Sequence, residues 1–162
     1  MDNYIVINGK KAELTQEQLE KLGIVVEKKD PFKRVEYGQR YHWISGDGNV
    51  YVAEDDRGVS SELCFVGGNY CTDKELIEQR ALHETLNRLL WRYAMQHNDG
   101  SNTLGWNNWC IYHNKGKFYV MQVNRYTTDM LGVVYFENAT TAEAAIEEIV
   151  KPFMAEHPEF RW

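Results

Sequence analysis

The chain has 162 residues, of which 43% are hydrophobic and 26% charged, a globular composition that excludes a disordered protein. The formal net charge of −6 argues against a protein that mainly coats a nucleic-acid backbone, because phosphate binding requires clustered lysines and arginines. No segment approaches the roughly 20 consecutive apolar residues of a membrane span, no secretory signal is visible, and three sparse cysteines fit a reducing compartment. We therefore expect a cytoplasmic protein without a membrane partner.

A β-hairpin and a short helix are expected at the N-terminus. Tyr4–Ile7 and Lys10–Leu14 flank Asn8-Gly9, the dipeptide most typical of two-residue hairpin turns. Thr15 and Gln18 then have the spacing of a capping box, in which each side chain accepts a hydrogen bond from the backbone of the other residue. Residues 1–38 are therefore expected to hold a hairpin, a helix and a connector.

The connector runs from Val26 to Gly38, after a helix end expected at Gly23. Pro31 excludes a continuous helix there. The stretch is locally basic, which we interpret as a solvated loop face or, alternatively, as a contact for an acidic partner. The cations concerned are Lys28, Lys29, Lys33, Arg34 and Arg40.

Residues 39–100 and 101–162 each predict two strands joined by a turn, a third strand and a helix. A capping box is expected at Thr72 and Glu75, and Glu84 and Arg88 have the spacing of a helical ion pair. The first set comprises strands Tyr41–Ile44, Val50–Ala53 and Leu63–Val66 and a helix from Thr72 to about His97. The second set comprises strands Trp109–Tyr112, Phe118–Met121 and Gly132–Phe136 and a helix from Thr140 to Val150 that Pro152 stops.

These two segments align without a gap at an offset of 68 positions, which places Gly48 on Gly116. The other matches are Tyr51 on Tyr119, Val52 on Val120, Arg57 on Arg125, Leu63 on Leu131, Val66 on Val134, Thr72 on Thr140 and Glu75 on Glu143. We interpret them as a duplication, with chance as the alternative, because the matches fall on a turn glycine, on strands and on helix caps. The predicted fold is α+β, with antiparallel sheets, helices and a pseudo-twofold β-β-β-α unit in one compact domain.

No motif for catalysis, metal binding or cofactor binding is recognisable. The histidines and cysteines lack metal-ligand spacing, and only an assembly of His42, Cys110 and His113 across two hairpins remains as an alternative to ordinary strand residues. Cys71 precedes an expected helix but has acidic neighbours, which oppose a thiolate. Gly67-Gly68 lacks the rest of a phosphate-binding loop. We expect no enzyme and no cofactor.

The segment Trp106, Asn107, Asn108, Trp109 is the strongest binding candidate in the sequence. Two tryptophans beside two asparagines could stack on a base, a sugar or a partner side chain. The alternative is that Trp109 packs inward while Trp106 covers the edge of the core. The strands alternate poorly between apolar and polar residues, so their second face is either buried or an aromatic surface for a partner.

Several stretches together resemble uncharacterised accessory proteins of phages and prophages in gut and related bacteria. They are Tyr4–Lys11, Pro31–Val35, Tyr41–Ile44, Val134–Phe136 and Thr140–Ala145. The resemblance implies an accessory phage protein, of the kind that often inhibits host defence, anti-CRISPR proteins included, by binding. We therefore predict a non-enzymatic inhibitor that contacts a host defence protein. The alternatives are a nucleic-acid-binding module that uses aromatic strands and the basic connector, and a sponge for a nucleotide signal.

Overall fold

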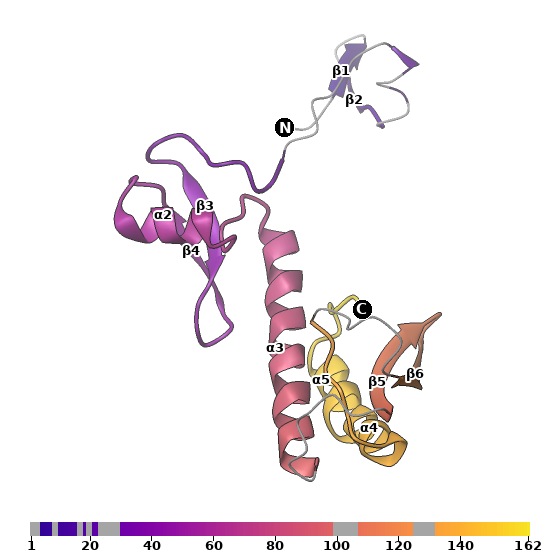
Figure 1. The fold of residues 1–162 in the computed structure, drawn as a ribbon. Helices are drawn as coiled ribbons and strands as arrows, with labels where there is room; N and C mark the ends of the chain where they lie inside the picture. The colour runs from indigo at the N-terminus through magenta and orange to yellow at the C-terminus, as the bar shows by residue number, and fades with distance from the viewer. Residues whose placement is uncertain are drawn as a thin grey trace. The chain divides into compact units, whose positions relative to one another are not determined.

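A computed structural model of the chain describes residues 4–7, 10–15, 18, 21–22, 30–98, 107–124 and 132–162. The chain divides into two compact units, Met1–Lys33 and Arg34–Trp162. Helices and two-stranded antiparallel sheets make up the described residues, so the α+β class is confirmed (Figure 1).

The first unit contains the expected hairpin. Strands β1 (Tyr4–Ile7) and β2 (Lys10–Glu13) pair antiparallel with Ile7 opposite Lys10, which leaves two residues for the turn. The capping box also forms: the Thr15 amide donates to Gln18 Oε1 over 2.8 Å, and the Gln18 amide donates to Thr15 Oγ1 over 3.3 Å. The helix end expected at Gly23 lies outside the described residues.

The second unit begins with the hairpin β3 (Arg40–Ile44) and β4 (Val50–Glu54), as expected. Cys71 then pairs with β3 as a single residue: the His42 amide donates to the Cys71 carbonyl over 2.7 Å, and the Cys71 amide returns a bond of 3.0 Å. The long helix α3 (Lys74–His97) follows. Ile44, Cys71, Ile77 and Ala81 form a small apolar cluster between this hairpin and the start of α3.

The strand expected at Leu63–Val66 is wrong, because these residues belong to helix α2 (Val59–Val66). Local hydrogen bonds explain the difference: Asp56 Oδ1 accepts from the Gly58 amide and from Ser61 Oγ, both at 2.8 Å, and so fixes the first turn of the helix. The helix ends in a Schellman arrangement, with Gly68 at a φ of 70° and the Asn69 amide bonded to the Cys64 carbonyl over 2.8 Å. Gly67-Gly68 is therefore a helix terminus.

The second hairpin consists of β5 (Asn107–Asn114) and β6 (Lys117–Asn124), both longer than expected. The third strand expected at Gly132–Phe136 is reduced to one residue. Phe136 pairs with Trp109 through two backbone hydrogen bonds of 2.7 and 2.8 Å, while residues 132–135 form no ladder.

The C-terminal helical segment runs through α4 (Ala139–Ala145), the π-helical turn η1 (Ile146–Val150) and α5 (Lys151–Glu156). The expectation that Pro152 stops the helix is wrong. In η1 the Lys151 amide bonds to the Ile146 carbonyl, five residues back, and Pro152 follows in the first turn of α5, where a missing N–H is tolerated.

The gapless offset of 68 does not extend to the helices. The side chain of Asp73 caps α3 by accepting from the Leu76 amide, and Asn138 caps α4 by accepting from the Thr141 amide. The caps expected at Thr72 and Thr140 are therefore wrong, since Thr72 precedes its cap residue and Thr140 follows its own. The hairpin registers do not share the offset of 68 either, because His42 pairs with Val52 and Cys71, whereas Trp109 pairs with Gln122 and Phe136. The duplication stays a prediction.

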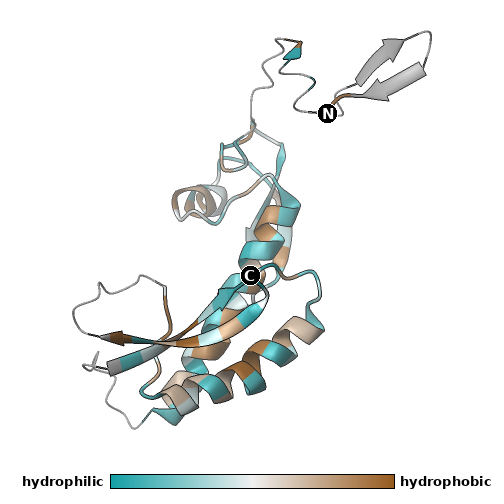
Figure 2. Ribbon diagram, turned by 90° about the vertical axis from the view of Figure 1, so that its right-hand side faces the viewer, coloured by the Kyte–Doolittle hydropathy of each residue, from teal (hydrophilic) through white to brown (hydrophobic). Residues whose placement is uncertain are grey.

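Helix α3 belongs to both halves of this unit (Figure 1). Its first turns face β3 and β4, whereas Leu86, Leu90, Tyr93 and Ala94 join the main apolar cluster with residues of α4, α5 and Phe136. Apolar and polar residues alternate along its length (Figure 2). No helix within the described ranges has the length and apolar character needed to cross a membrane.

Candidate binding surface

The tryptophan–asparagine segment predicted to bind a partner lies only partly in the described residues. Trp106 falls outside them, and Asn107 begins β5. Asn108 is half-buried opposite Val123. Trp109 is half-buried, pairs with Phe136 and packs against the main apolar cluster. Trp109 thus packs inward, which was the alternative to its binding a partner.

The basic connector is divided in the same way. Lys28 and Lys29 lie outside the described residues, while Lys33 and Arg40 are exposed, with Arg40 Nε 3.8 Å from a Glu54 carboxylate oxygen. Arg34 has a different environment: its Nε and Nη2 donate to both oxygens of Asp55 over 2.8 and 3.2 Å, and its Nη1 donates to Glu62. Its charge is neutralised within the chain rather than offered to a partner.

Asp55 is the centre of this internal network. Its buried carboxylate also accepts from the Tyr70 hydroxyl and from the Arg57 amide, each over 3.0 Å. The hydrogen bonds from Arg34 hold the pKa of Asp55 far below its usual value, and the same contact raises the pKa of Arg34. Tyr70 stacks on Tyr41 with ring centroids 4.1 Å apart. Both oxygens of Asp55 accept hydrogen bonds from within the chain, so we interpret this network as one that joins α2, β4 and the connector.

The residues considered for thiol or metal chemistry do not form a site. His42 lies in β3, whereas Cys110 and His113 lie three positions apart on β5 and so face opposite sides of that strand. Within the described residues no three potential metal ligands come together. Burial raises the pKa of the Cys71 and Cys110 thiols, which disfavours the thiolate at both positions.

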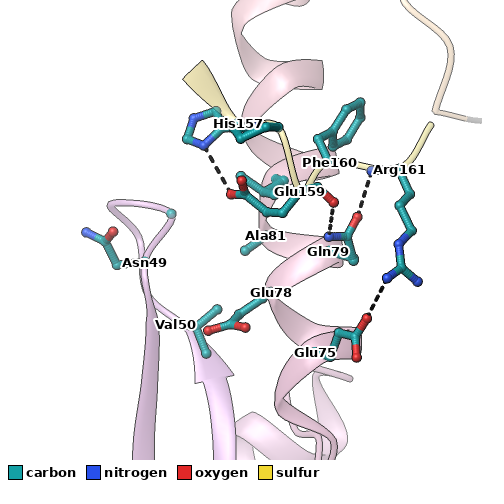
Figure 3. A pocket seen from close by; sticks show the side chains of 13 residues that line it. Asn49, Val50, Glu75, Glu78, Gln79, Ala81, His157, Glu159, Phe160 and Arg161 are labelled. Carbon is teal, nitrogen blue, oxygen red and sulfur yellow. Dashed lines mark hydrogen bonds and ion pairs between the residues drawn. The ribbon is translucent and has the colours of Figure 1, made fainter. Parts of the chain in front are cut away.

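An open pocket of about 850 Å³ lies between the β3–β4 turn, α3 and the C-terminal residues (Figure 3). Gln79 fastens the chain end, donating to the Glu159 carbonyl and accepting from the Arg161 amide, both over 2.9 Å. Arg161 also donates to Glu75 over 2.8 Å, and Glu78 pairs with Lys74. The polar groups of this pocket are thus engaged with one another, which explains how the chain end is held.

A different surface is exposed on the second half of α3. Positions 77, 81, 84, 88, 91 and 95 alternate by four and three residues, so they lie along one face of the helix. Ile77 and Ala81 are buried in the cluster behind the β3–β4 hairpin. Further along, Trp91 is 59% exposed and Met95 is 41% exposed. The same helix face therefore begins in the core and ends as an apolar surface in solvent.

Two arginines border this surface. Arg88 and Arg92 lie with Trp91 and Met95 at positions i, i+3, i+4 and i+7; we call these four residues the α3 surface. At its upstream end Arg88 donates to the Gly46 carbonyl over 3.4 Å and to Thr85 over 3.3 Å. A Cβ on Gly48, whose φ is 89°, would approach Arg88 to 2.9 Å, so glycine allows the turn to lie against the helix. The β3–β4 turn thus marks the upstream boundary of the α3 surface.

The ion pair expected between Glu84 and Arg88 is wrong. Arg80 Nε lies 2.7 Å from Glu84 Oε1, so this carboxylate pairs one turn upstream and leaves Arg88 without it. The same Arg80 side chain also donates from Nη1 to the Gly68 carbonyl at the end of α2.

Other faces also expose apolar side chains, among them Tyr51 and Val52 on β4. On α2 they are Val59, Leu63 and Val66, and on the β5–β6 hairpin they are Tyr112, Tyr119 and Met121. The charges beside α2 are already paired, as in Arg34 with Glu62, and Tyr112 stacks on Tyr119 across the strands with centroids 5.2 Å apart. The α3 surface differs because an exposed tryptophan lies beside arginines that no carboxylate of the described residues neutralises.

The α3 surface was not among the binding candidates expected from the sequence. A signal was present, since Trp91 and Met95 fall outside the apolar stripe that contains Leu82, Leu86 and Tyr93. Large apolar residues away from the core-facing stripe of a helix require another partner or remain in water.

Comparison with protein-family models, with curated proteins and with solved structures found no match to this chain. The geometry of the α3 surface is therefore the basis for a functional conclusion.

Proposed function

We propose that this chain is a non-enzymatic binding protein that acts by protein–protein contact through the α3 surface. The observation that carries the proposal is the 59% exposed indole of Trp91 on a regular helix, bordered by Arg88 and Arg92. Tryptophan and arginine are the residue types most enriched among interface positions that dominate binding energy, and methionine is also enriched in interfaces.

The rigidity of the surface supports the same proposal. The opposite side of α3 is fixed in the main apolar cluster by Leu86, Leu90 and Tyr93. The backbone that presents Trp91 is therefore already ordered before any partner arrives, and association does not have to order it.

A more specific form of the proposal is an inhibitor of a bacterial defence effector, of phage or prophage origin and acting in the host cytoplasm. It is supported by the resemblance described above and by the net charge of −6. The nucleic-acid alternative is weakened because Arg34, a central cation of the basic connector, is committed to Asp55.

Site-specific photo-crosslinking in bacterial cells tests the contact. A benzophenone amino acid replaces Gln96, which is exposed at the flank of the α3 surface, and in a control chain it replaces the exposed Glu156 of α5. We expect a discrete protein adduct from position 96 that Trp91→Ala reduces about tenfold or more, as for an interface hot spot. The matched control Leu63→Ser, on the exposed face of α2, should leave the adduct unchanged.

The proposal is overturned if position 96 yields only what position 156 yields, or if Trp91→Ala leaves the adduct intact. Circular dichroism of each variant checks that the fold is retained.

A further inference from the structure

We propose that the segment docking on the α3 surface is acidic: an amphipathic helix of a partner protein with carboxylates on both sides of an apolar ridge. The inference rests on the proposed function and names the chemistry of its partner. The arginines in the described part of the second unit differ in whether a carboxylate lies beside them.

Most of those arginines are neutralised within the chain. Carboxylate oxygens lie within 4.0 Å of a guanidinium nitrogen in Arg34, Arg40, Arg57, Arg80 and Arg161. Among the described residues, Arg88 and Arg92 have no such partner. Among the described arginines of this unit, the two without a carboxylate partner are thus the two that border Trp91.

The nearest acidic side chains are committed elsewhere. Glu84, one turn upstream of Arg88, pairs with Arg80 over 2.7 Å. Asp47, in the turn that lies against Arg88, accepts from Ser45 Oγ over 2.6 Å and from the Asn49 amide over 3.0 Å. Like charges at i and i+4 destabilise a helix, so the repulsion between Arg88 and Arg92 slightly weakens α3. A partner carboxylate would remove that repulsion.

The shape of the surface indicates a helix as the partner element. Residues 88–95 cover two turns, about 10 Å at 1.5 Å per residue. Trp91 and Met95 form a short ridge on this stretch, and side-chain ridges of one helix pack into the grooves of another. The partner's apolar residues would contact that ridge while its flanking glutamates or aspartates reach the arginines, which bind carboxylates with two parallel hydrogen bonds.

A protein is favoured over a nucleic acid on three grounds. Two cations are few for a phosphate backbone, the net charge of the chain is −6, and Met95 offers an aliphatic contact rather than a charge or a stacking ring.

The crosslinking assay at position 96 separates this inference from the proposed function. Arg88→Glu with Arg92→Glu should lower the adduct about tenfold or more, because two attractive contacts become repulsive. Arg88→Lys with Arg92→Lys should retain most of it. Lys115→Glu with Lys117→Glu, at the exposed β5–β6 turn, gives the same change in net charge and should leave it unaffected. An adduct that survives the arginine reversal but is lost in Trp91→Ala overturns the acidic partner alone, and no adduct at all overturns the proposed function as well.

A second measurement identifies the chemistry with defined probes. The indole N–H signal of Trp91, assigned with Trp91→Phe, is followed by NMR during titration. The probes are a leucine–glutamate amphipathic peptide, its leucine–lysine counterpart and a single-stranded oligothymidine. The inference predicts a shift with the glutamate peptide that Arg88→Glu with Arg92→Glu abolishes. Equal shifts with both peptides, no shift with either, or a shift with oligothymidine instead would overturn it.

Discussion

The β3–β4 hairpin with α3 and the β5–β6 hairpin with α4 share a local geometry and differ in what fills the space beside them. In each, one residue bonds back to the first strand, Cys71 to β3 and Phe136 to β5, and the helix cap follows two positions later. Beside the first hairpin lie α2, the ionic network of Asp55, the stacked rings of Tyr41 and Tyr70, and a small apolar cluster. Beside the second lies the main apolar cluster. One backbone arrangement thus packs against a buried ionic and aromatic network in one place and against a larger apolar cluster in the other.

The largest expected effect comes from removing a side chain of the main apolar cluster beside the β5–β6 hairpin. Phe136→Ala removes a fully buried ring and should lower the free energy of unfolding by about 4 kcal/mol. Cys71→Ala, at the equivalent position, removes one buried atom and should cost about 1 kcal/mol. Urea denaturation of both variants measures the difference, and equal losses would contradict the claim that apolar burial is larger at Phe136 than at Cys71.

The next largest expected effect comes from removing the buried carboxylate of Asp55. Asp55→Ala leaves Arg34 and the Tyr70 hydroxyl without their buried acceptor and should cost about 3 kcal/mol of unfolding free energy. Its exposed neighbour Glu54 is the matched control, and Glu54→Ala should change stability by less than about 0.5 kcal/mol. Calorimetry of the two variants checks the prediction, which a loss in Asp55→Ala no larger than in Glu54→Ala would contradict.

Lowering the pH should destabilise the β3–β4 hairpin more than the β5–β6 hairpin. The pKa of Asp55 is depressed by Arg34, so its contribution to stability is present above the unfolded pKa of about 3.9 and is lost as pH falls below that value. We expect amide protection factors in β3, β4 and α2 to fall between about pH 5 and about pH 2 more than those in β5 and β6. In Asp55→Asn this difference should shrink, whereas an unchanged difference would assign the acid sensitivity to other groups.

The smallest effect tests the helix caps. Asp73→Ala and Asn138→Ala should each cost about 1 kcal/mol, since each removes the acceptor for a backbone amide of the first turn. Thr140→Ala, at the position first expected to cap α4, should stay within about 0.5 kcal/mol. Thermal unfolding compares the variants. A larger loss of stability in Thr140→Ala than in Asn138→Ala would favour Thr140 as the residue that caps α4.

Much of the fold could be predicted from local patterns. The N-terminal hairpin, the capping box at Thr15 and Gln18, both later hairpins and α3 depend on turn residues, alternation and helical spacing that act within a few positions. The third strands could not be predicted. Leu63–Val66 has strand-forming residues but no strand to pair with, and the acceptors on Asp56 start a helix there instead. Phe136 is reduced to one pairing residue.

The candidate site was missed because its defining property is an absence of neighbours. Helical spacing is enough to predict a helix over residues 74–97 that carries Trp91 and Arg92. The packing of other segments sets the rest. The β3–β4 hairpin covers this helix face at Ile77 and Ala81 and ends at Arg88, Glu84 pairs with Arg80, and Asp55 binds Arg34. Helical spacing follows from the backbone of one segment, whereas exposure and charge pairing depend on which distant segments pack against it.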